Sequence, residues 1–160
     1  MGALDELIER YYPVILRYCM WHAPNRACAE DAAQETFLKA IRHLNAYAHR
    51  GHFRAFLYQI AANTCIDMRR KRDGTNLSLE ALADEWLCEE DGYDLAEESM
   101  EIRRLVRCLP EQLREIVLLR FSQELTLREI AEITHLPLRT AQSRLRTALK
   151  LIKKQLEVER

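Results

Sequence analysis

Four side chains near the C-terminus have the types and the spacing that suit contacts with DNA bases. They occupy positions i, i+3, i+4 and i+7 and are Arg139, Gln142, Ser143 and Arg146, so on an α-helix they share one face. Arg can hold guanine with two hydrogen bonds, Gln can pair with adenine, and Ser or Arg can hold a phosphate. The segment 138–154 carries six basic residues and no acidic one. This pattern predicts a helix that lies in the major groove of double-stranded DNA.

The residues before that helix are typical of a helix-turn-helix. Thr126 and Glu129 match the capping box, in which each side chain binds the backbone N–H of the other residue at a helix start. We expect a short supporting helix over 126–134, a turn at 135–137 and a recognition helix over 138–154. The apolar stripe of the recognition helix is Leu138, Ala141, Leu145, Ala148, Leu149, Ile152 and Leu156. A helix with a merely solvated basic face is the simpler alternative, but the coincidence of these features favours DNA binding.

Charge is strongly segregated along the chain, although the net charge is only −1. The segment 39–72 has eight Lys or Arg residues against Asp67 alone, whereas the segment 76–102 has ten acidic residues and no basic one. A near-neutral total is therefore compatible with a polyanionic partner. Two basic blocks separated by an acidic one suggest two contact surfaces on one polymer.

The spacing of apolar residues predicts an all-α protein. Helices are expected at 4–22, with Pro13 as a point where the first could kink, at 28–46 and at 53–70. A further helix opens at Leu109-Pro110, with a core stripe of Leu113, Ile116, Val117 and Phe121. No run of alternating β-branched residues suggests a sheet. No apolar stretch approaches the roughly 20 residues needed to span a bilayer, and the polar N-terminus does not resemble a signal peptide.

Three segments carry a resemblance to a known family. The segment 109–156 resembles the C-terminal domain of bacterial sigma factors, which recognises the promoter −35 element. The segments AEDAAQETFLKAI (29–41) and FRAFLYQIAANTCIDMRRKR (53–72) resemble its N-terminal partner domain. The resemblance covers almost the whole chain except the acidic segment. Two domains in this order resemble the small extracytoplasmic-function (ECF) type of sigma factor.

The resemblance implies a function and a division of the chain. We expect the chain to bind core RNA polymerase, to direct it to a class of promoters and to help open the −10 region. The implied division is a polymerase-binding and −10-recognising domain at 1–74, an acidic linker at 75–99 and a −35-recognising helix-turn-helix domain at 100–160.

The resemblance also implies the residues of each surface. Those in the segment that docks on the clamp helices of the largest polymerase subunit are Asp31, Gln34, Glu35, Phe37 and Leu38. The residues at the positions with which the family recognises and melts the −10 element are Arg50, Arg54, Asn63, Asp67, Arg69 and Arg70. Those at the −35 contact positions are Arg139, Thr140, Gln142, Ser143, Arg144 and Arg146.

Elementary chemistry agrees with the −10 assignment and leaves some residues open. Separated strands need a cationic groove and planar side chains that stack on exposed bases, for which Tyr47, His49 and His52 are available. Core packing is the better interpretation of Phe53, while Tyr47 stays open between the two roles. Asp31 and Glu35 are equally compatible with a solvated helix face.

The sequence departs from the family pattern at several positions. Phe56 replaces the usual Trp, and Ala32-Ala33 replaces bulkier aliphatic residues. His135 replaces the usual Gly of the turn, where a left-handed backbone suits His less well than Gly. Arg139 and Ala141 replace Gly and Val, so the extra Arg could add a base or phosphate contact.

Two other classes of protein are alternatives to the sigma factor. A helix-turn-helix regulator that does not replace a sigma factor would bind duplex DNA without polymerase, but it would leave the motifs at 29–41 and 53–72 without a purpose. A metal- or redox-responsive protein could use Cys19, His22 and Cys28, yet their spacing fits no standard zinc site and lone helical Cys residues usually pack in cores.

The remaining expectations follow from what the sequence lacks and from the family. No phosphate loop, nucleophile motif or catalytic carboxylate pair is present, so we expect no enzymatic activity, no cofactor and no metal. Five widely spaced Cys residues suit reduced thiols in a cytoplasm. The resemblance implies core RNA polymerase, promoter DNA and an anti-sigma factor as partners, without direct membrane insertion of this chain.

Overall fold

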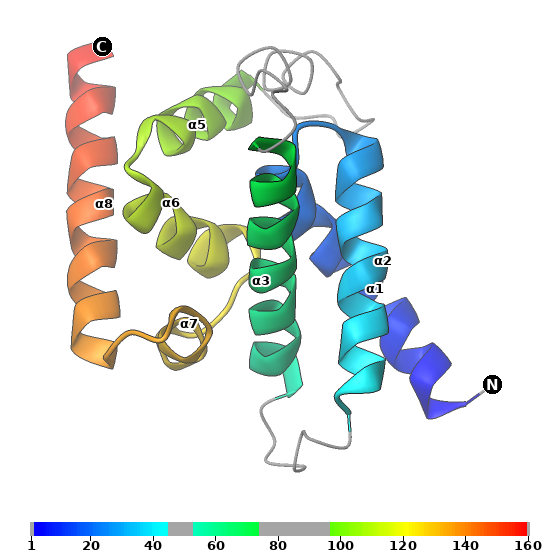
Figure 1. The fold of residues 1–160 in the computed structure, drawn as a ribbon. Coiled ribbons are helices and arrows are strands. Elements are labelled where there is room, and N and C mark those ends of the chain that lie inside the picture. The colour runs from blue at the N-terminus through cyan, green and yellow to red at the C-terminus, as the bar shows by residue number, and fades with distance from the viewer. Residues whose placement is uncertain (1, 45–52, 74–96, 160) are drawn as a thin grey trace. The chain divides into compact units, whose positions relative to one another are not determined.

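The computed structural model describes residues 2–44, 53–73 and 97–159, and every regular element in these ranges is a helix (Figure 1). The chain divides into two compact units, Met1–Asp91 (unit 1) and Gly92–Arg160 (unit 2). The prediction of an all-α protein with two helical parts is confirmed. The predicted loop at 47–52 and the linker segment up to residue 96 lie outside the described residues.

Unit 1 contains three helices, α1 (Ala3–His22), α2 (Arg26–Arg42) and α3 (Phe53–Asp73), with α2 packed against both of the others. Helix α1 continues through Pro13 without a break. Asn25 begins α2, because its Oδ1 accepts a hydrogen bond of 2.8 Å from the backbone N–H of Cys28. That contact satisfies one of the N–H groups that a helix start leaves without an internal partner.

The core of unit 1 combines small side chains with two buried tyrosines. Ala32 and Ala33 are 2% and 0% exposed, so these departures from the family pattern lie inside the fold. Tyr18 and Tyr58 are each 1% exposed and their rings meet edge to face, with centroids 5.6 Å apart.

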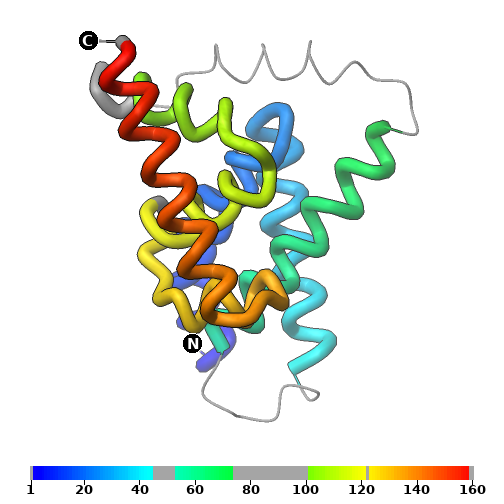
Figure 2. The backbone as a smooth tube through the Cα atoms, turned by 90° about the vertical axis from the view of Figure 1, so that its left-hand side faces the viewer, coloured from blue at the N-terminus to red at the C-terminus, as the bar shows by residue number. Residues whose placement is uncertain are grey.

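Unit 2 contains α5 (Glu97–Cys108), α6 (Glu111–Val117), the π-helical turn η1 (Leu118–Ser122), α7 (Leu127–Thr134) and α8 (Leu138–Glu159). The long helix α8 contacts α5, α6 and α7 and so forms one side of the unit (Figure 2). Its buried residues Ala141, Leu145 and Ala148 recur every three or four positions, as the apolar stripe predicts. Leu149, placed in the same stripe, is instead 42% exposed.

The π turn explains why one predicted core residue lies at the surface. Phe121 was expected to continue the stripe of Ile116 and Val117, but it is 57% exposed. In η1 the backbone N–H of Gln123 donates to the carbonyl oxygen of Leu118 at 3.2 Å, an i→i+5 bond that widens the turn. The wider turn keeps Leu118 and Leu119 inside and rotates Phe121 outward.

Candidate nucleic-acid interface

The helix-turn-helix of unit 2 has the predicted local structure. Thr126 Oγ1 accepts a hydrogen bond of 3.2 Å from the N–H of Glu129, and Glu129 Oε1 accepts one of 3.0 Å from the N–H of Thr126. Helix α7 ends at His135, whose φ of 58° is left-handed, and Leu136 N–H donates to the carbonyl of Ala131 at 3.0 Å. The capping box and the left-handed turn are both confirmed. Together they fix the start and the end of α7.

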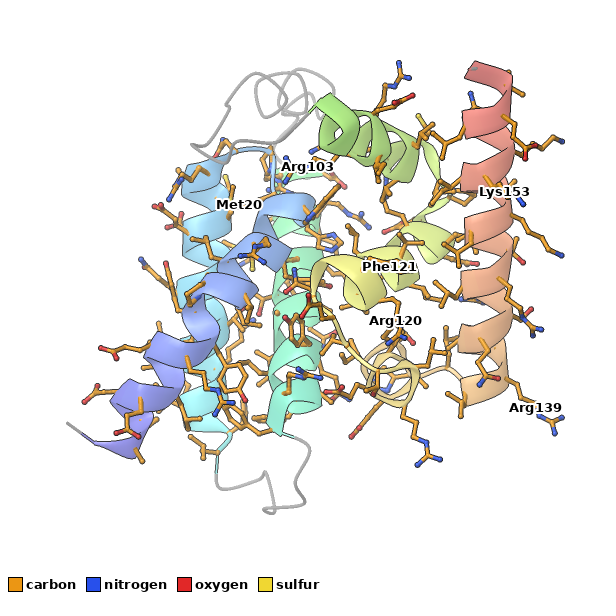
Figure 3. All side chains as sticks on the ribbon, turned by 180° about the vertical axis from the view of Figure 1, so that it is seen from behind. Met20, Arg103, Arg120, Phe121, Arg139 and Lys153 are labelled. Atoms are coloured by element: carbon orange, nitrogen blue, oxygen red, sulfur yellow. The ribbon has the colours of Figure 1, made fainter. Side chains whose placement is uncertain are left out.

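The predicted DNA-contacting side chains lie on the outer face of α8. Arg139, Gln142, Ser143 and Arg146 are exposed, while Thr140 and Arg144 are half-buried. Figure 3 shows Arg139 extending away from unit 2 at the N-terminal end of α8 and Lys153 extending outward near the other end. The buried Ala141 and Leu145 hold the opposite face against the unit. The arrangement leaves basic and polar side chains exposed along the first turns of α8.

The second set of predicted DNA contacts lies on α3. Asn63, Asp67 and Arg70 are exposed, and Arg54 and Arg69 are half-buried. Arg50 lies outside the described residues, as do Tyr47, His49 and His52, so the loop part of this surface has no structural account. Phe53 is half-buried, and its ring centroid lies 5.5 Å from that of Tyr11 and 6.3 Å from that of Phe56. These ring contacts agree with the packing role favoured for Phe53.

A lysine of α2 reaches the same region of α3. Lys39 Nζ donates a hydrogen bond of 3.3 Å to Thr64 Oγ1 and lies 3.9 Å from Asp67 Oδ2. Thr64 is 1% exposed, whereas the side chains of Lys39 and Asp67 are 31% and 56% exposed. Sequence analysis counted Lys39 only as part of a basic block. Lys39 and Asp67 are 28 residues apart in sequence and lie on different helices, so the periodicity of one helix could not predict their contact.

The predicted polymerase-binding set on α2 is divided between surface and core. Asp31, Gln34 and Leu38 are exposed and Glu35 is half-buried. Phe37 is buried: it is 8% exposed, and its ring centroid lies 5.8 Å from that of Tyr12. Its side chain therefore supports the surface from inside instead of forming part of it.

A second apolar residue of α2 is exposed beside Leu38. Ile41 is 41% exposed and follows Leu38, which is 50% exposed, by three positions. Residues three apart on a helix are neighbours on its surface. Leu38 and Ile41 therefore lie side by side on the exposed face of α2.

Three guanidinium groups gather between α5 and α6. The pKa of Arg107 falls to about 10, mainly because the side chain is withdrawn from water and also because Arg103 and Arg114 repel its charge. Arg114 Nη1 donates to the carbonyl oxygen of Arg107 at 3.3 Å. This hydrogen bond ties the side chain of α6 to the last turn of α5.

The cysteines pair in a way that differs from the metal-site alternative. Cys19 and Cys65 are buried with their Sγ atoms 3.8 Å apart, whereas Cys28 is half-buried at the start of α2. In residues 2–44, 53–73 and 97–159, no three His, Cys, Asp or Glu side chains gather closely enough to hold a metal ion. Separately, none of the described helices combines the length and apolar composition that a bilayer crossing requires.

Comparison with known proteins links both units to one family. The family model for sigma-70 region 2 matches residues 7–75, and the model for sigma-70 region 4 matches residues 99–152. The RNA polymerase sigma factor YlaC of Bacillus subtilis is 33% identical over 82% of this chain and 79% of its own length. The ECF RNA polymerase sigma factor SigW of the same organism is 29% identical over 96% of this chain and 89% of its own length.

Solved sigma factor structures have the same fold. The sigma factor RpoE of Bartonella quintana, crystallised with the anti-sigma factor NepR, matches with a TM-score of 0.76 at 19% identity over 100% of both chains. CnrH, in complex with the cytosolic domain of CnrY, matches with a TM-score of 0.72 at 20% identity over 99% of this chain and 90% of its own. At such identities the likeness concerns the fold alone.

Proposed function

This chain belongs to the ECF type of the sigma-70 family of RNA polymerase sigma factors, and from that membership we propose which of its surfaces performs each step of promoter recognition. As a sigma factor it binds core RNA polymerase and directs promoter-specific initiation of transcription. The presence of region 2 explains the motifs that a plain helix-turn-helix regulator would leave without a purpose. We assign polymerase binding and −10 recognition to 1–74 and −35 recognition to 100–160, joined by the acidic linker at 75–99. Helix α5 begins at Glu97, so the last three residues of that proposed linker are helical.

Helix α8 is the proposed reader of the duplex −35 element. The observation that carries this proposal is the acid-free outer face of its residues 138–154, held outward by a buried stripe on the other side. The N-terminal residues of a recognition helix contact base edges, while phosphates are held by basic groups farther along and beside it. The residues that we assign to this contact are Arg139, Thr140, Gln142, Ser143, Arg144 and Arg146.

The exposed part of α3 is the proposed reader of the melted −10 element. Asn63 and Asp67 supply hydrogen-bonding groups one turn apart, and Arg70 follows on the next turn. Separated strands retain their phosphates, so basic groups beside the base-contacting residues favour their capture. The residues assigned to this surface are Arg50, Arg54, Asn63, Asp67, Arg69 and Arg70.

The outer face of α2 is the proposed docking surface for the polymerase clamp. Exposed Leu38 and Ile41 offer an apolar patch, and Asp31, Gln34 and Glu35 border it with polar groups. An apolar centre with a polar border is the usual composition of a protein interface. Phe37 belongs to this proposal as the buried support of the patch.

We extend the proposal to regulation and location. The solved relatives RpoE and CnrH were each determined with a bound protein, and NepR is named an anti-sigma factor. By analogy, an anti-sigma factor would bind this chain and exclude polymerase. The chain would act in the cytoplasm, where RNA polymerase lies, and without catalysis of its own.

The −35 assignment is tested by exchanging Arg146 for Ala in the holoenzyme. We expect R146A to reduce initiation from a −35-dependent promoter by about tenfold, the loss of one good base contact. Lys153→Ala is the matched control, since it removes one positive charge from the distal end of the same helix and should have a smaller effect (Figure 3). Affinity for core polymerase should stay unchanged in both variants. Equal initiation from R146A and wild type would show that a different face of α8 contacts the DNA.

A further inference from the structure

We infer that Lys39 is a positioning residue for −10 recognition, which holds and neutralises the Asp67 carboxylate on the DNA-contacting face of α3. The inference rests on the function proposed for α3 and concerns a residue that lies on a different helix, α2. It gives a role to a contact that joins the proposed polymerase-binding helix to a proposed −10 contact.

The geometry fixes the Lys39 ammonium between two atoms of α3. Thr64 Oγ1 accepts its hydrogen bond at 3.3 Å, and Asp67 Oδ2 lies at 3.9 Å. Because Thr64 is 1% exposed, its hydroxyl is a rigid anchor, and it lies one helical position from Asn63 and three from Asp67. A long Lys side chain loses rotamer freedom when it is held, and the buried anchor supplies part of that constraint.

The charges around Asp67 explain why its carboxylate needs a positive partner such as Lys39. Asp67 is the only acidic residue in the segment 39–72, and after Met68 come Arg69, Arg70, Lys71 and Arg72. A carboxylate accepts hydrogen bonds and cannot donate them, so beside a strand it suits the amino group of a base and repels phosphates. The positive charge of Lys39, whose Nζ lies 3.9 Å from Asp67 Oδ2, offsets that repulsion.

The expected size of the effect is modest. The pair is more than a third exposed on the Asp67 side and its distance is long for an ion pair, so screening by water is substantial. Exposed pairs of this kind change an equilibrium by up to about fivefold. We therefore expect a two- to fivefold coupling, roughly, between the two residues in strand binding.

The test is a double-mutant cycle in the holoenzyme. The probe is a labelled single strand carrying the −10 segment of a promoter on which the wild-type holoenzyme initiates. Lys39→Gln should weaken binding about two- to fivefold when Asp67 is present and leave it nearly unchanged in the Asp67→Asn background. Lys39→Arg should recover most of the loss, because it restores the charge.

Two further variants make the outcome specific. Lys71→Gln is the charge-matched control: it removes one exposed positive charge from the basic end of α3. Any loss of strand binding that it causes should be the same factor in both backgrounds. Lys39→Met keeps most of the aliphatic stem and removes the ammonium with its charge and its hydrogen bond to Thr64. It should show the same dependence on Asp67, and it replaces Lys39→Gln in the cycle if that variant folds poorly. Thermal unfolding of each variant identifies losses that come from instability.

Two results would overturn the inference, and they differ. If Lys39→Gln lowered the affinity for the strand equally in both backgrounds, Lys39 would act on DNA directly, and the proposed role of Asp67 would be unaffected. A holoenzyme with Asp67→Asn that matches wild type in strand affinity and in base preference would remove the proposed role of Asp67, and the role of Lys39 with it.

Discussion

Adjacent residues of α2 face opposite environments, and this contrast separates stability from binding. Phe37 is 8% exposed against the ring of Tyr12, whereas Leu38 is 50% exposed. Phe37→Ala should lower the free energy of unfolding by about 3–5 kcal/mol, the usual cost of truncating a buried ring. Leu38→Ala should change it by less than about 0.5 kcal/mol and should weaken binding to core polymerase. Denaturant unfolding and a polymerase-binding assay measure the two effects. Undiminished polymerase binding by Leu38→Ala would remove that residue from the proposed patch.

The buried thiol of Cys19 should be unreactive in the folded protein. Its pKa is raised, first by the contact with the Cys65 thiol and then by burial, so the reactive thiolate is rare at neutral pH. We expect an alkylating reagent to modify the exposed Cys108 first and Cys19 only after denaturation, as mass spectrometry of peptides would show. Because an unfolded thiol ionises near its ordinary pKa of 9.0, this group favours folding below that pH and loses that contribution above it. Modification of native Cys19 at the rate of Cys108 would contradict the burial.

Among the helices, α7 has a capping box that should make a measurable contribution to the free energy of unfolding. Thr126→Ala removes the hydroxyl that accepts from the N–H of Glu129, and such losses cost about 1 kcal/mol. Glu129→Gln is the matched control, because Gln can still accept from the N–H of Thr126 and preserves the box. Urea unfolding of the full chain compares the two. A cost as large for Glu129→Gln as for Thr126→Ala would indicate that the carboxylate charge, and not the box, stabilises this helix start.

Sequence was a good guide to elements whose cause is local. The spacing of Ala141, Leu145 and Ala148 predicts the inner face of α8, and the Thr126–Glu129 pair predicts where α7 begins, because each depends on residues a few positions apart. The left-handed backbone of His135 follows from its place in the turn. These features needed no information from the rest of the chain.

Features that depend on distant packing were not predictable in this way. The π turn rotates Phe121 outward, although α-helical periodicity places it inside. Tyr18 and Tyr58 meet across α1 and α3, and Lys39 meets Asp67 across α2 and α3. The exposure of Ile41 likewise depends on which face of α2 its neighbours cover. Such contacts are set by how helices dock, which periodicity in a single helix does not contain.

At the scale of the whole molecule, the net charge of −1 conceals two basic surfaces and an acidic segment. Each proposed DNA contact is confined to one unit, so neither alone spans a promoter. We therefore attribute strong and specific binding to the holoenzyme, in which polymerase holds both surfaces to one DNA molecule. Linked sites of this kind gain affinity through effective concentration without any new contact.

We propose that two separate surfaces of this sigma factor recognise two promoter elements. The direct test is in vitro transcription from a promoter library with randomised −35 and −10 segments, using core polymerase reconstituted with this chain. We expect the wild-type holoenzyme to start transcription at specific sites. Arg146→Ala should relax the base preference in the −35 segment only, and Asp67→Asn should relax it in the −10 segment only. Both substitutions altering the same segment, or neither altering any preference, would contradict this proposal.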